Sequence, residues 1–175
     1  MKGSTIRLLI KYGADVNAKD KSHSTPLHLA SSSLMSAETV RLLIEHGADL
    51  NARNETHRTP LHLVSSWVSA TARLSSLICR RADVNGQADC DWNGPQWSIT
   101  KAETVQLLIE NGADVTAKDK ALSTPLHLAC SHGSYKTVQL LIDQGADVTA
   151  QDECHRTPLH LASAWVSTTT ASLLI

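Results

Sequence analysis

The chain has 175 residues, of which 42% are hydrophobic, and its 16 basic and 17 acidic residues give a net charge of −1. Neither sign of charge forms a long run, which argues against a nucleic-acid or anionic-membrane surface, and no apolar run approaches the ~18 residues needed to cross a bilayer. Four cysteines without CxxC spacing favour a reduced, intracellular setting in the cytoplasm or the nucleus.

The first predicted element in chain order is a helix over residues 5–12, which meets Gly13 at its end. A second, short helix is expected after Thr25. Thr25 suits the N-cap position, and Pro26 suits the first helical position, where a missing N–H leaves no hydrogen bond unmade. This pattern predicts a helix whose start is fixed by local chemistry.

The next predicted helix covers residues 39–46, where Val40, Leu43 and Ile44 share one face at helical spacing. Gly47 then supplies the left-handed residue that ends a helix. The polar residues that follow form the connection to the next short helix. Two helices of this length leave apolar faces that only neighbouring units can bury.

Two motifs recur along the chain. Thr-Pro-Leu-His-Leu begins at Thr25, Thr59, Thr124 and Thr157, and Gly-Ala-Asp begins at Gly13, Gly47, Gly112 and Gly145. The threonines are separated by 34, 65 and 33 residues. The middle gap is two periods, so one copy is expected to be missing or degraded near Gly94-Pro95. Arg81 replaces the glycine of a fifth Gly-Ala-Asp copy.

These motifs, in fixed phase at a period near 33 residues, resemble the ankyrin repeat family over essentially the whole chain. The resemblance implies an all-α solenoid of stacked helix–turn–helix units with short β-hairpin or loop tips, here as part of a longer array. The predicted units are a partial repeat at 1–20, repeats at 21–54 and 55–88, a degenerate repeat at 89–119, a repeat at 120–152 and a truncated repeat at 153–175.

A longer period is also present. Residues 2–20 match residues 101–119 at an offset of 99, and residues 55–63 match residues 153–161 at an offset of 98. The duplicated unit is therefore a block of three repeats. The degenerate repeat has a shortened first helix, and we expect a kink or disorder between Arg81 and Lys101. Simple degeneration is favoured over a specialised binding insertion.

Histidine occurs nine times, and four of these residues follow a threonine of the repeated motif. Neighbouring copies lie one repeat apart, too far to share one metal ion, so no metal site and no cofactor are expected. The resemblance implies that each histidine forms hydrogen bonds within and between repeats. The structural pairs are Thr25 with His28, Thr59 with His62, Thr124 with His127, and Thr157 with His160.

Candidate binding residues are those that depart from the repeat pattern. The family usually has glycine at the hairpin tip, and this chain has His23, His57, Leu122 and His155 there; Arg58 and Arg156 adjoin two of them and could extend a ladder along one edge. Such a tip is either a binding surface or a solvated turn. Trp67 and Trp165 lie near the ends of first helices, where they either pack over a turn or contact a partner, and Trp92 is a further candidate.

No phosphate-binding loop, metalloprotease motif or nucleophile–base constellation is present, so the chain is not expected to be an enzyme. We expect an adaptor or scaffold that binds a partner protein through the concave helix face and the hairpin tips, without nucleic acid, membrane or small-molecule substrate. The alternative is a structural or targeting arm of a larger protein with a catalytic domain elsewhere. The resemblance also implies that Asn17, Asn51 and Asn85 match a position that asparaginyl hydroxylases modify.

Overall fold

The computed structural model describes residues 2–32, 37–66, 97–131 and 135–164. Those residues form eight α-helices and no strand. The helices are α1 (Lys2–Lys11), α2 (Pro26–Ser32), α3 (Ala37–Glu45), α4 (Pro60–Ser66), α6 (Trp97–Glu110), α7 (Pro125–Ser131), α8 (Tyr135–Asp143) and α9 (Pro158–Ala164). The connecting hairpins are therefore built from turns alone within the described ranges.

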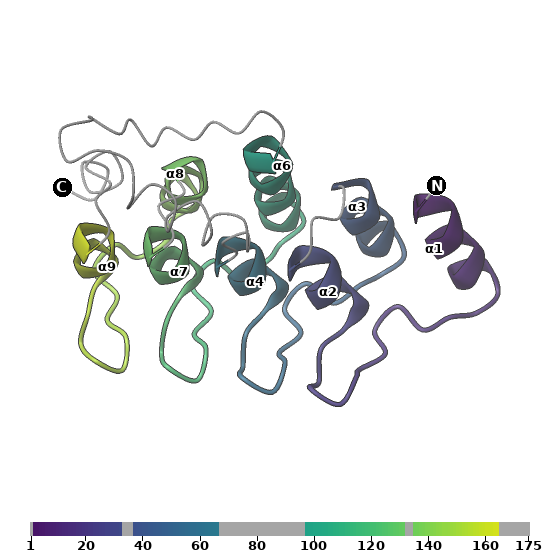
Figure 1. The fold of residues 1–175 in the computed structure, drawn as a ribbon, viewed down its shortest axis with the longest axis horizontal. Coiled ribbons are helices and arrows are strands. Elements are labelled where there is room, and N and C mark those ends of the chain that lie inside the picture. Colours follow the sequence, from purple (N-terminus) through teal and green to yellow (C-terminus); the bar gives the residue numbers. More distant parts are fainter. Residues whose placement is uncertain (1, 33–36, 67–96, 132–134, 165–175) are drawn as a thin grey trace, which may run out of the picture.

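The helices stand in two rows (Figure 1). The short helices α2, α4, α7 and α9 pack side by side in a first row, and the longer helices α1, α3, α6 and α8 form a second row, which lies above the first in this view. Each short helix is preceded by a hairpin that projects away from the second row. The result is an elongated solenoid in which each unit contacts mainly its neighbours.

Each short helix begins in the same way because threonine, proline and histidine occupy its first turn. The backbone oxygen of Thr25 accepts the first helical hydrogen bond from the N–H of Leu29, at 3.3 Å. Pro26 follows at the first helical position, where no N–H is needed. His28, at the third position, turns its ring back to the N–H of Thr25 at 3.1 Å. The histidine thus takes the place of the acidic residue in a capping box.

The longer helices end at a glycine in the left-handed conformation. Gly47 has φ of 83°, and the N–H of Ala48 reaches back to the oxygen of Leu43 at 3.0 Å. Gly13, Gly112 and Gly145 have the same role, with φ between 82° and 94°. The glycine lets the chain reverse toward the hairpin without the backbone strain that a residue with a Cβ atom has in the left-handed conformation.

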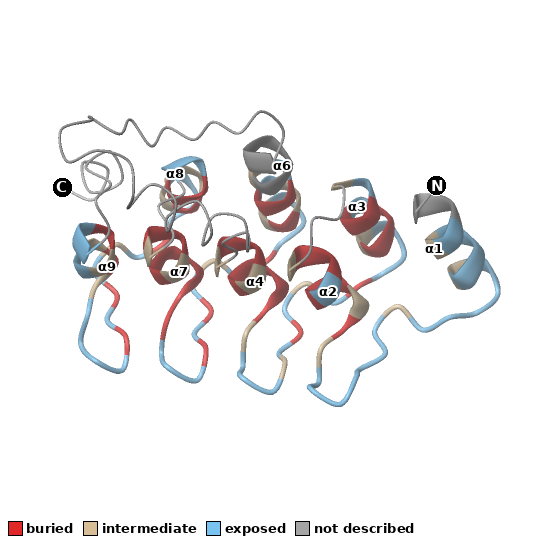
Figure 2. Ribbon diagram, viewed as in Figure 1, coloured by how far each residue is buried: buried red, intermediate tan, exposed pale blue. Residues whose placement is uncertain are grey.

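The core lies between the two rows of helices (Figure 2). The short helices α2, α4 and α7 each contribute a leucine from their first turn, and the longer helices α3, α6 and α8 each contribute a valine and a leucine. The largest buried aliphatic side chains are Leu27, Leu61 and Leu126 from the first row and Val40, Val105, Leu108, Val138 and Leu141 from the second. Leucine, valine and alanine side chains therefore make up most of the hydrophobic core among the described residues.

The short helix α4 lies directly beside α7 in the first row and in front of α6 in the second. This differs from the expectation of a separate short first helix near Gly94-Pro95. Residues 97–110 form one continuous helix instead, because this stretch contains neither glycine nor proline. The described part of the expected kink, residues 97–101, is helical. Residues 67–96 lie outside the described residues, and the unit boundaries at 88 and 119 remain predictions.

Candidate functional site

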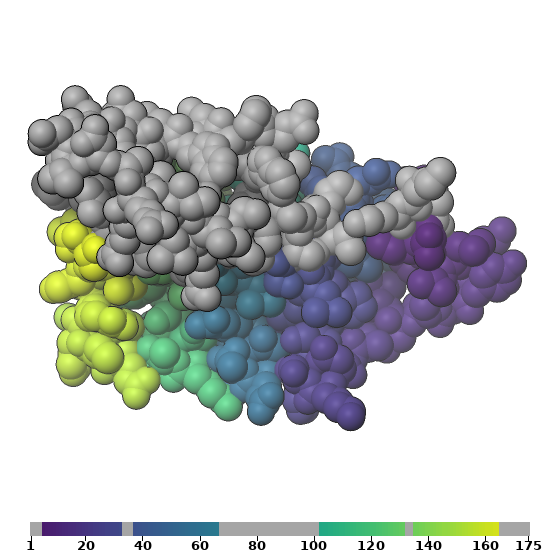
Figure 3. Space-filling view, in the orientation of Figure 1, coloured from purple at the N-terminus to yellow at the C-terminus, as the bar shows by residue number. Residues whose placement is uncertain are grey.

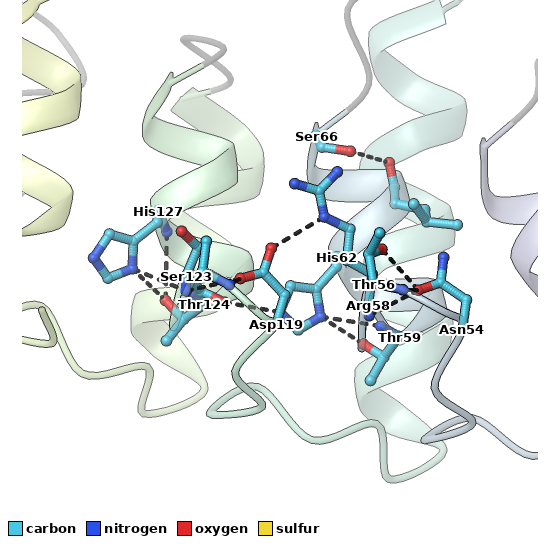
Figure 4. Close-up of polar contacts among 12 residues, drawn as sticks. Asn54, Thr56, Arg58, Thr59, His62, Ser66, Asp119, Ser123, Thr124 and His127 are labelled. Atoms are coloured by element: carbon cyan, nitrogen blue, oxygen red, sulfur yellow. Dashed lines mark hydrogen bonds and ion pairs between the residues drawn. The ribbon is translucent and has the colours of Figure 1, made fainter. Parts of the chain in front are cut away.

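The threonine–histidine pairs form a repeated polar unit at the start of each short helix (Figure 4). In the third pair, the backbone N–H of Thr124 donates to Nδ1 of His127 at 3.2 Å, and Oγ1 of Thr124 lies 2.9 Å from the same nitrogen. The pairs at Thr25, Thr59 and Thr157 have the same geometry. Each histidine ring is thereby held in one orientation by its own helix.

The other ring nitrogen connects each unit to the next. Nε2 of His28 lies 3.0 Å from the oxygen of Arg58, Nε2 of His62 lies 3.1 Å from the oxygen of Ser123, and Nε2 of His127 lies 3.0 Å from the oxygen of Arg156. Because a backbone N–H can only donate, Nδ1 is the acceptor and Nε2 carries the proton. The ring is neutral, and both of its nitrogens are occupied.

Burial also favours the neutral ring. Desolvation lowers the pKa of His28 and of His62 below the ordinary histidine value, and the backbone oxygens that accept from their rings offset this only in part. A ring with no free lone pair is unable to bind a metal ion without breaking the connection. Among the described residues, no cluster of histidine, cysteine and carboxylate side chains has the arrangement of a metal site.

Each hairpin is held by one Asp or Asn side chain. Oδ1 of Asp119 accepts from the N–H groups of Ala121 at 2.9 Å and of Ser123 at 3.0 Å. The same double acceptance is made by Asp20, Asn54 and Asp152 in the other hairpins. The signal for these residues was present in the sequence, because an Asp or Asn recurs five residues before each repeated threonine.

The hairpin tips have a left-handed backbone although none of their residues is glycine. The φ angles are 57° at His23, 60° at His57, 56° at Leu122 and 57° at His155. Histidine tolerates this region better than most large residues, and leucine does so poorly. All four side chains are exposed. The predicted tip residues therefore occupy one equivalent, strained and outward position in successive hairpins.

The hairpins are joined to one another by backbone hydrogen bonds. The N–H of Glu55 donates to the oxygen of Ser22 at 2.9 Å, and the N–H of Glu153 donates to the oxygen of Ala121 at 2.9 Å. Between these two connections, the N–H of Lys120 donates to the oxygen of Thr56 at 3.1 Å. The four tips therefore form a continuous edge with fixed spacing.

The two arginines beside the tips bind buried carboxylates rather than facing freely outward. Nε of Arg58 lies 3.0 Å from Oδ2 of Asp119 in the next hairpin, and the Asp119 side chain is only 3% exposed. Arg156 instead pairs with Asp152 of its own hairpin at 2.8 Å. Arg58 has Asn54, which carries no charge, where Arg156 has Asp152. Arg58 therefore has no carboxylate at that position of its own hairpin, and the next hairpin supplies Asp119.

Two of the three asparagines expected to match a modification site connect neighbouring units. Nδ2 of Asn17 donates to the oxygen of Gly47 at 3.0 Å, while its Oδ1 accepts from the N–H of Asp49 at 2.8 Å. Asn51 makes the same pair of bonds to Gly112 and Asp114. Both amides are therefore occupied structurally, and hydroxylation remains a prediction that no contact here tests.

Cys130 is the buried thiol of the described region. Burial raises its pKa to about 12, so the thiol stays protonated and inert at neutral pH. Cys154 lies in a hairpin and is exposed. Four other sequence candidates, Trp67, Trp92, Trp165 and Asn85, lie outside the described residues.

The comparison with known families follows this geometry. A family model for ankyrin repeats in three copies matches residues 1–88 and again residues 96–175. The chain belongs to the ankyrin repeat family. The matches cover residues 67–88, so the repeat pattern of the sequence continues through part of the chain that the structure does not describe.

Membership in the ankyrin family assigns the solenoid to a non-catalytic interaction fold, and family members generally bind other proteins. The predicted family, the helical solenoid and the general class of interaction module are confirmed. No curated protein matches the chain significantly. None of the described helices has the length and apolar character required to span a membrane.

Proposed function

We propose that this ankyrin protein is an adaptor or scaffold that binds a partner protein along the edge formed by its hairpin tips and the adjoining first-helix row. The observation that carries the proposal is the row of exposed side chains at four equivalent left-handed positions. They are His23, His57, Leu122 and His155.

The backbone of these tips favours a binding role over a purely structural one. A left-handed residue with a side chain costs about 1–2 kcal/mol, and glycine avoids this cost. Among the described residues, the side chains of His23 and His57 have no hydrogen-bond partner, and His155 makes a single long contact of 3.3 Å to Gln151. The contacts of these side chains within the chain therefore offset little of the free-energy cost of the left-handed backbone. We infer that these side chains instead contact another molecule.

The rigid spacing of the tips suits recognition of an extended protein surface. Backbone hydrogen bonds join each hairpin to the next, and Arg58 adds an ion pair to Asp119 at the centre of the edge. A surface that is already ordered loses little conformational entropy when it binds. Modest contacts at successive tips then add to a useful affinity without one dominant pocket.

We place this interaction inside the cell, in the cytoplasm or nucleus. Cys130 and Cys154 are both free thiols, and a reducing compartment keeps such thiols unpaired.

The test replaces the tip histidines by glycine. The triple variant His23→Gly, His57→Gly and His155→Gly removes three presented rings and suits the left-handed backbone, so the fold is retained. The matched control, Arg41→Ala with Glu45→Ala, alters exposed residues on α3. Affinity purification from the native host with quantitative mass spectrometry, followed by calorimetry with the purified partner, measures binding.

We expect the partner to be lost from the tip variant and kept by the α3 variant. Chemical cross-links should join the partner to Lys21 or Lys120, which lie next to the tips. A partner that binds the tip variant as tightly as the unaltered chain would place the binding face elsewhere.

A further inference from the structure

Each hairpin presents one charged residue directly after the Asp or Asn that holds its turn. The sign of this charge alternates from one hairpin to the next. In order along the edge, the four residues are Lys21, Glu55, Lys120 and Glu153. All four side chains are exposed, and none of them forms an ion pair with another described residue. The tip edge therefore displays a row of free charges of alternating sign.

The alternation belongs to the folded chain, because it depends on which hairpins are neighbours. The N–H groups of Glu55, Lys120 and Glu153 each donate to a backbone oxygen of the preceding hairpin, at 2.9, 3.1 and 2.9 Å. The hairpins of Glu55 and Lys120 are therefore adjacent, although the two residues lie far apart in the sequence. The four tips stand side by side along the lower edge of the molecule in Figure 3.

Other charged side chains of the hairpins have partners within the chain. Arg58 and Arg156 each pair with a buried carboxylate. Lys118 stands further from its tip and near Asp147 of the next unit. Hydrogen bonds from Thr149 are the main cause of the lowered pKa of Asp147, and the charge of Lys118 adds to them. The alternating residues are thus the charges that the tips leave available to another molecule.

A row of four alternating charges is complementary to its own reverse. Two copies that meet edge to edge and antiparallel bring Lys21 against Glu153 of the other copy, and Glu55 against Lys120. Every charge then meets one of opposite sign. When the two edges are parallel and in register, each charge instead meets its own kind, which is unfavourable. The charge pattern therefore favours one orientation.

We propose that a second copy of this chain binds along the tip edge, antiparallel to the first and related to it by a twofold axis. The proposal rests on the proposed function of this edge and names its occupant. The axis passes between the two central hairpins, so His57 lies against Leu122 of the other copy. The side chain of Leu122 is 48% exposed, and covering it removes apolar surface from water at the centre of a charged contact.

The symmetry and the chemistry of this contact determine how it should behave. Both copies use the same surface, so the contact is isologous and closes at a dimer. Exposed ion pairs each contribute little, so the dimer should form only at high protein concentration. The screening length falls from about 10 Å in 0.1 M salt to about 3 Å in 1 M salt, so added salt should dissociate it.

Charge reversal tests the contact with two matched variants. Lys21→Glu with Lys120→Glu leaves four acidic residues along the row, and Glu55→Lys with Glu153→Lys leaves four basic ones. All four positions are exposed, so both variants should fold, which circular dichroism verifies. Each variant alone brings like charges together in the antiparallel arrangement. A mixture of the two variants brings opposite charges together again.

The control, Lys11→Glu with Lys136→Glu, makes the same change of charge as the acidic variant at exposed positions on α1 and α8. Sedimentation velocity over a concentration series in low salt measures association. We expect the unaltered chain and the control to form dimers and nothing longer. Each edge variant should have a dissociation constant at least about tenfold higher, because like charges then oppose one another. The mixture of the two edge variants should dimerise again.

Cross-linking with a carbodiimide, which joins an amine to a carboxylate, reports the orientation of the two copies. Lys21 and Glu153 lie in the first and the last of the four hairpins, so a link between them requires two copies. We expect this link, with light and heavy isotope labels on its two halves, when differently labelled copies are mixed. A link from Lys21 only to Glu55 would contradict the antiparallel register.

A chain that stays monomeric at its solubility limit overturns the proposal. So does a dimer that survives both edge variants, or a mixture of the two that stays monomeric. The glycine variant of the tip histidines distinguishes this failure from failure of the proposed function. A monomeric chain whose glycine variant loses a different protein would keep the edge as a binding surface and reject the second copy. A monomeric chain whose glycine variant keeps every partner would reject both.

Discussion

The side chain of His62 donates from Nε2 to the backbone oxygen of Ser123 at 3.1 Å, although 61 positions separate the two residues in the sequence. The equivalent bonds of His28 and His127 span 30 and 29 positions. This hydrogen bond joins the two halves of the described solenoid. It connects α4 to the hairpin that precedes α7, and these two short helices pack directly against each other in the first row.

Replacing His62 by alanine should destabilise the chain by about 2–3 kcal/mol, because the N–H of Thr59 and the oxygen of Ser123 both lose a buried partner. Urea denaturation followed by circular dichroism measures the loss. His160→Ala is the matched control, since its ring is exposed and bonds only within its own unit. We expect a smaller loss there, and equal losses would argue against the inter-repeat bond as the cause.

Acidification should weaken the fold through the buried histidines. The folded pKa of His28 and of His62 lies below the ordinary value of 6.5, so the unfolded chain binds more protons. The stability that the two neutral histidines contribute to the fold is complete above pH 6.5. It is lost as the pH falls from there toward their pKa values in the folded chain. Carboxylates with a lowered pKa, such as Asp152, change the stability only below pH 3.8. They therefore do not contribute to the loss of stability just below pH 6.5.

Urea midpoints measured on both sides of pH 6.5 test this dependence. The double variant His28→Gln and His62→Gln keeps a polar side chain and removes two titrating groups, so its stability should change less steeply with pH. An unchanged slope in that variant would assign the effect to other histidines.

The ion pair between Arg58 and Asp119 should show a coupling free energy of about 1 kcal/mol in a double-mutant cycle. Arg58→Ala and Asp119→Asn are suitable single changes, since asparagine retains the oxygen that accepts from the hairpin N–H groups. The exposed pair of Arg7 with Glu38, 3.9 Å apart, is the comparison and should show almost no coupling. Similar coupling in the two cycles would mean that burial of Asp119 has no influence.

Glycine at a hairpin tip should stabilise the fold. His57 has φ of 60°, and His57→Gly removes its left-handed strain, which should raise the free energy of unfolding by about 0.5 kcal/mol after the entropy of glycine is counted. Gly47→Ala is the opposite control. A Cβ there meets nothing within 4 Å, so its expected loss of about 1 kcal/mol comes from the backbone alone. Thermal unfolding should show a higher melting temperature for His57→Gly and a lower one for Gly47→Ala.

Thiol labelling should separate the two described cysteines. Cys154 is exposed and should react with iodoacetamide in the folded chain, whereas Cys130 is buried with a pKa near 12 and should react only after unfolding. Site-resolved mass spectrometry at low urea measures both rates. Rapid labelling of Cys130 under native conditions would show that the core around α7 opens readily.

Much of the solenoid was predictable from short motifs because their chemistry is local. Thr25 with Pro26 specifies a helix start, and Gly47 specifies a helix end, whatever lies around them. The left-handed tips were also predictable, since His57 stands where the family has glycine. These features depend on a few consecutive residues, and sequence spacing alone reveals them.

Features that depend on neighbouring units were not predictable in the same way. Arg58 was expected at an exposed edge, but its partner Asp119 lies 61 positions away. The equivalent position in its own hairpin is Asn54, which carries no charge. The exposure of Leu9 on α1 was also missed, because the sequence of a helix does not reveal whether another helix covers it.

The contact between α4 and α7 has a consequence for the order of folding. Neighbouring units are joined by contacts between residues about 30 positions apart in the sequence, such as His28 and Arg58. The contact between α4 and the hairpin before α7 joins residues 61 positions apart. Each doubling of a closed loop adds about 0.6 kcal/mol of chain entropy. The parts on either side should therefore assemble first, with α2 and α3 before the junction and α7 to α9 after it. The junction at His62 then forms last and should be the first to open.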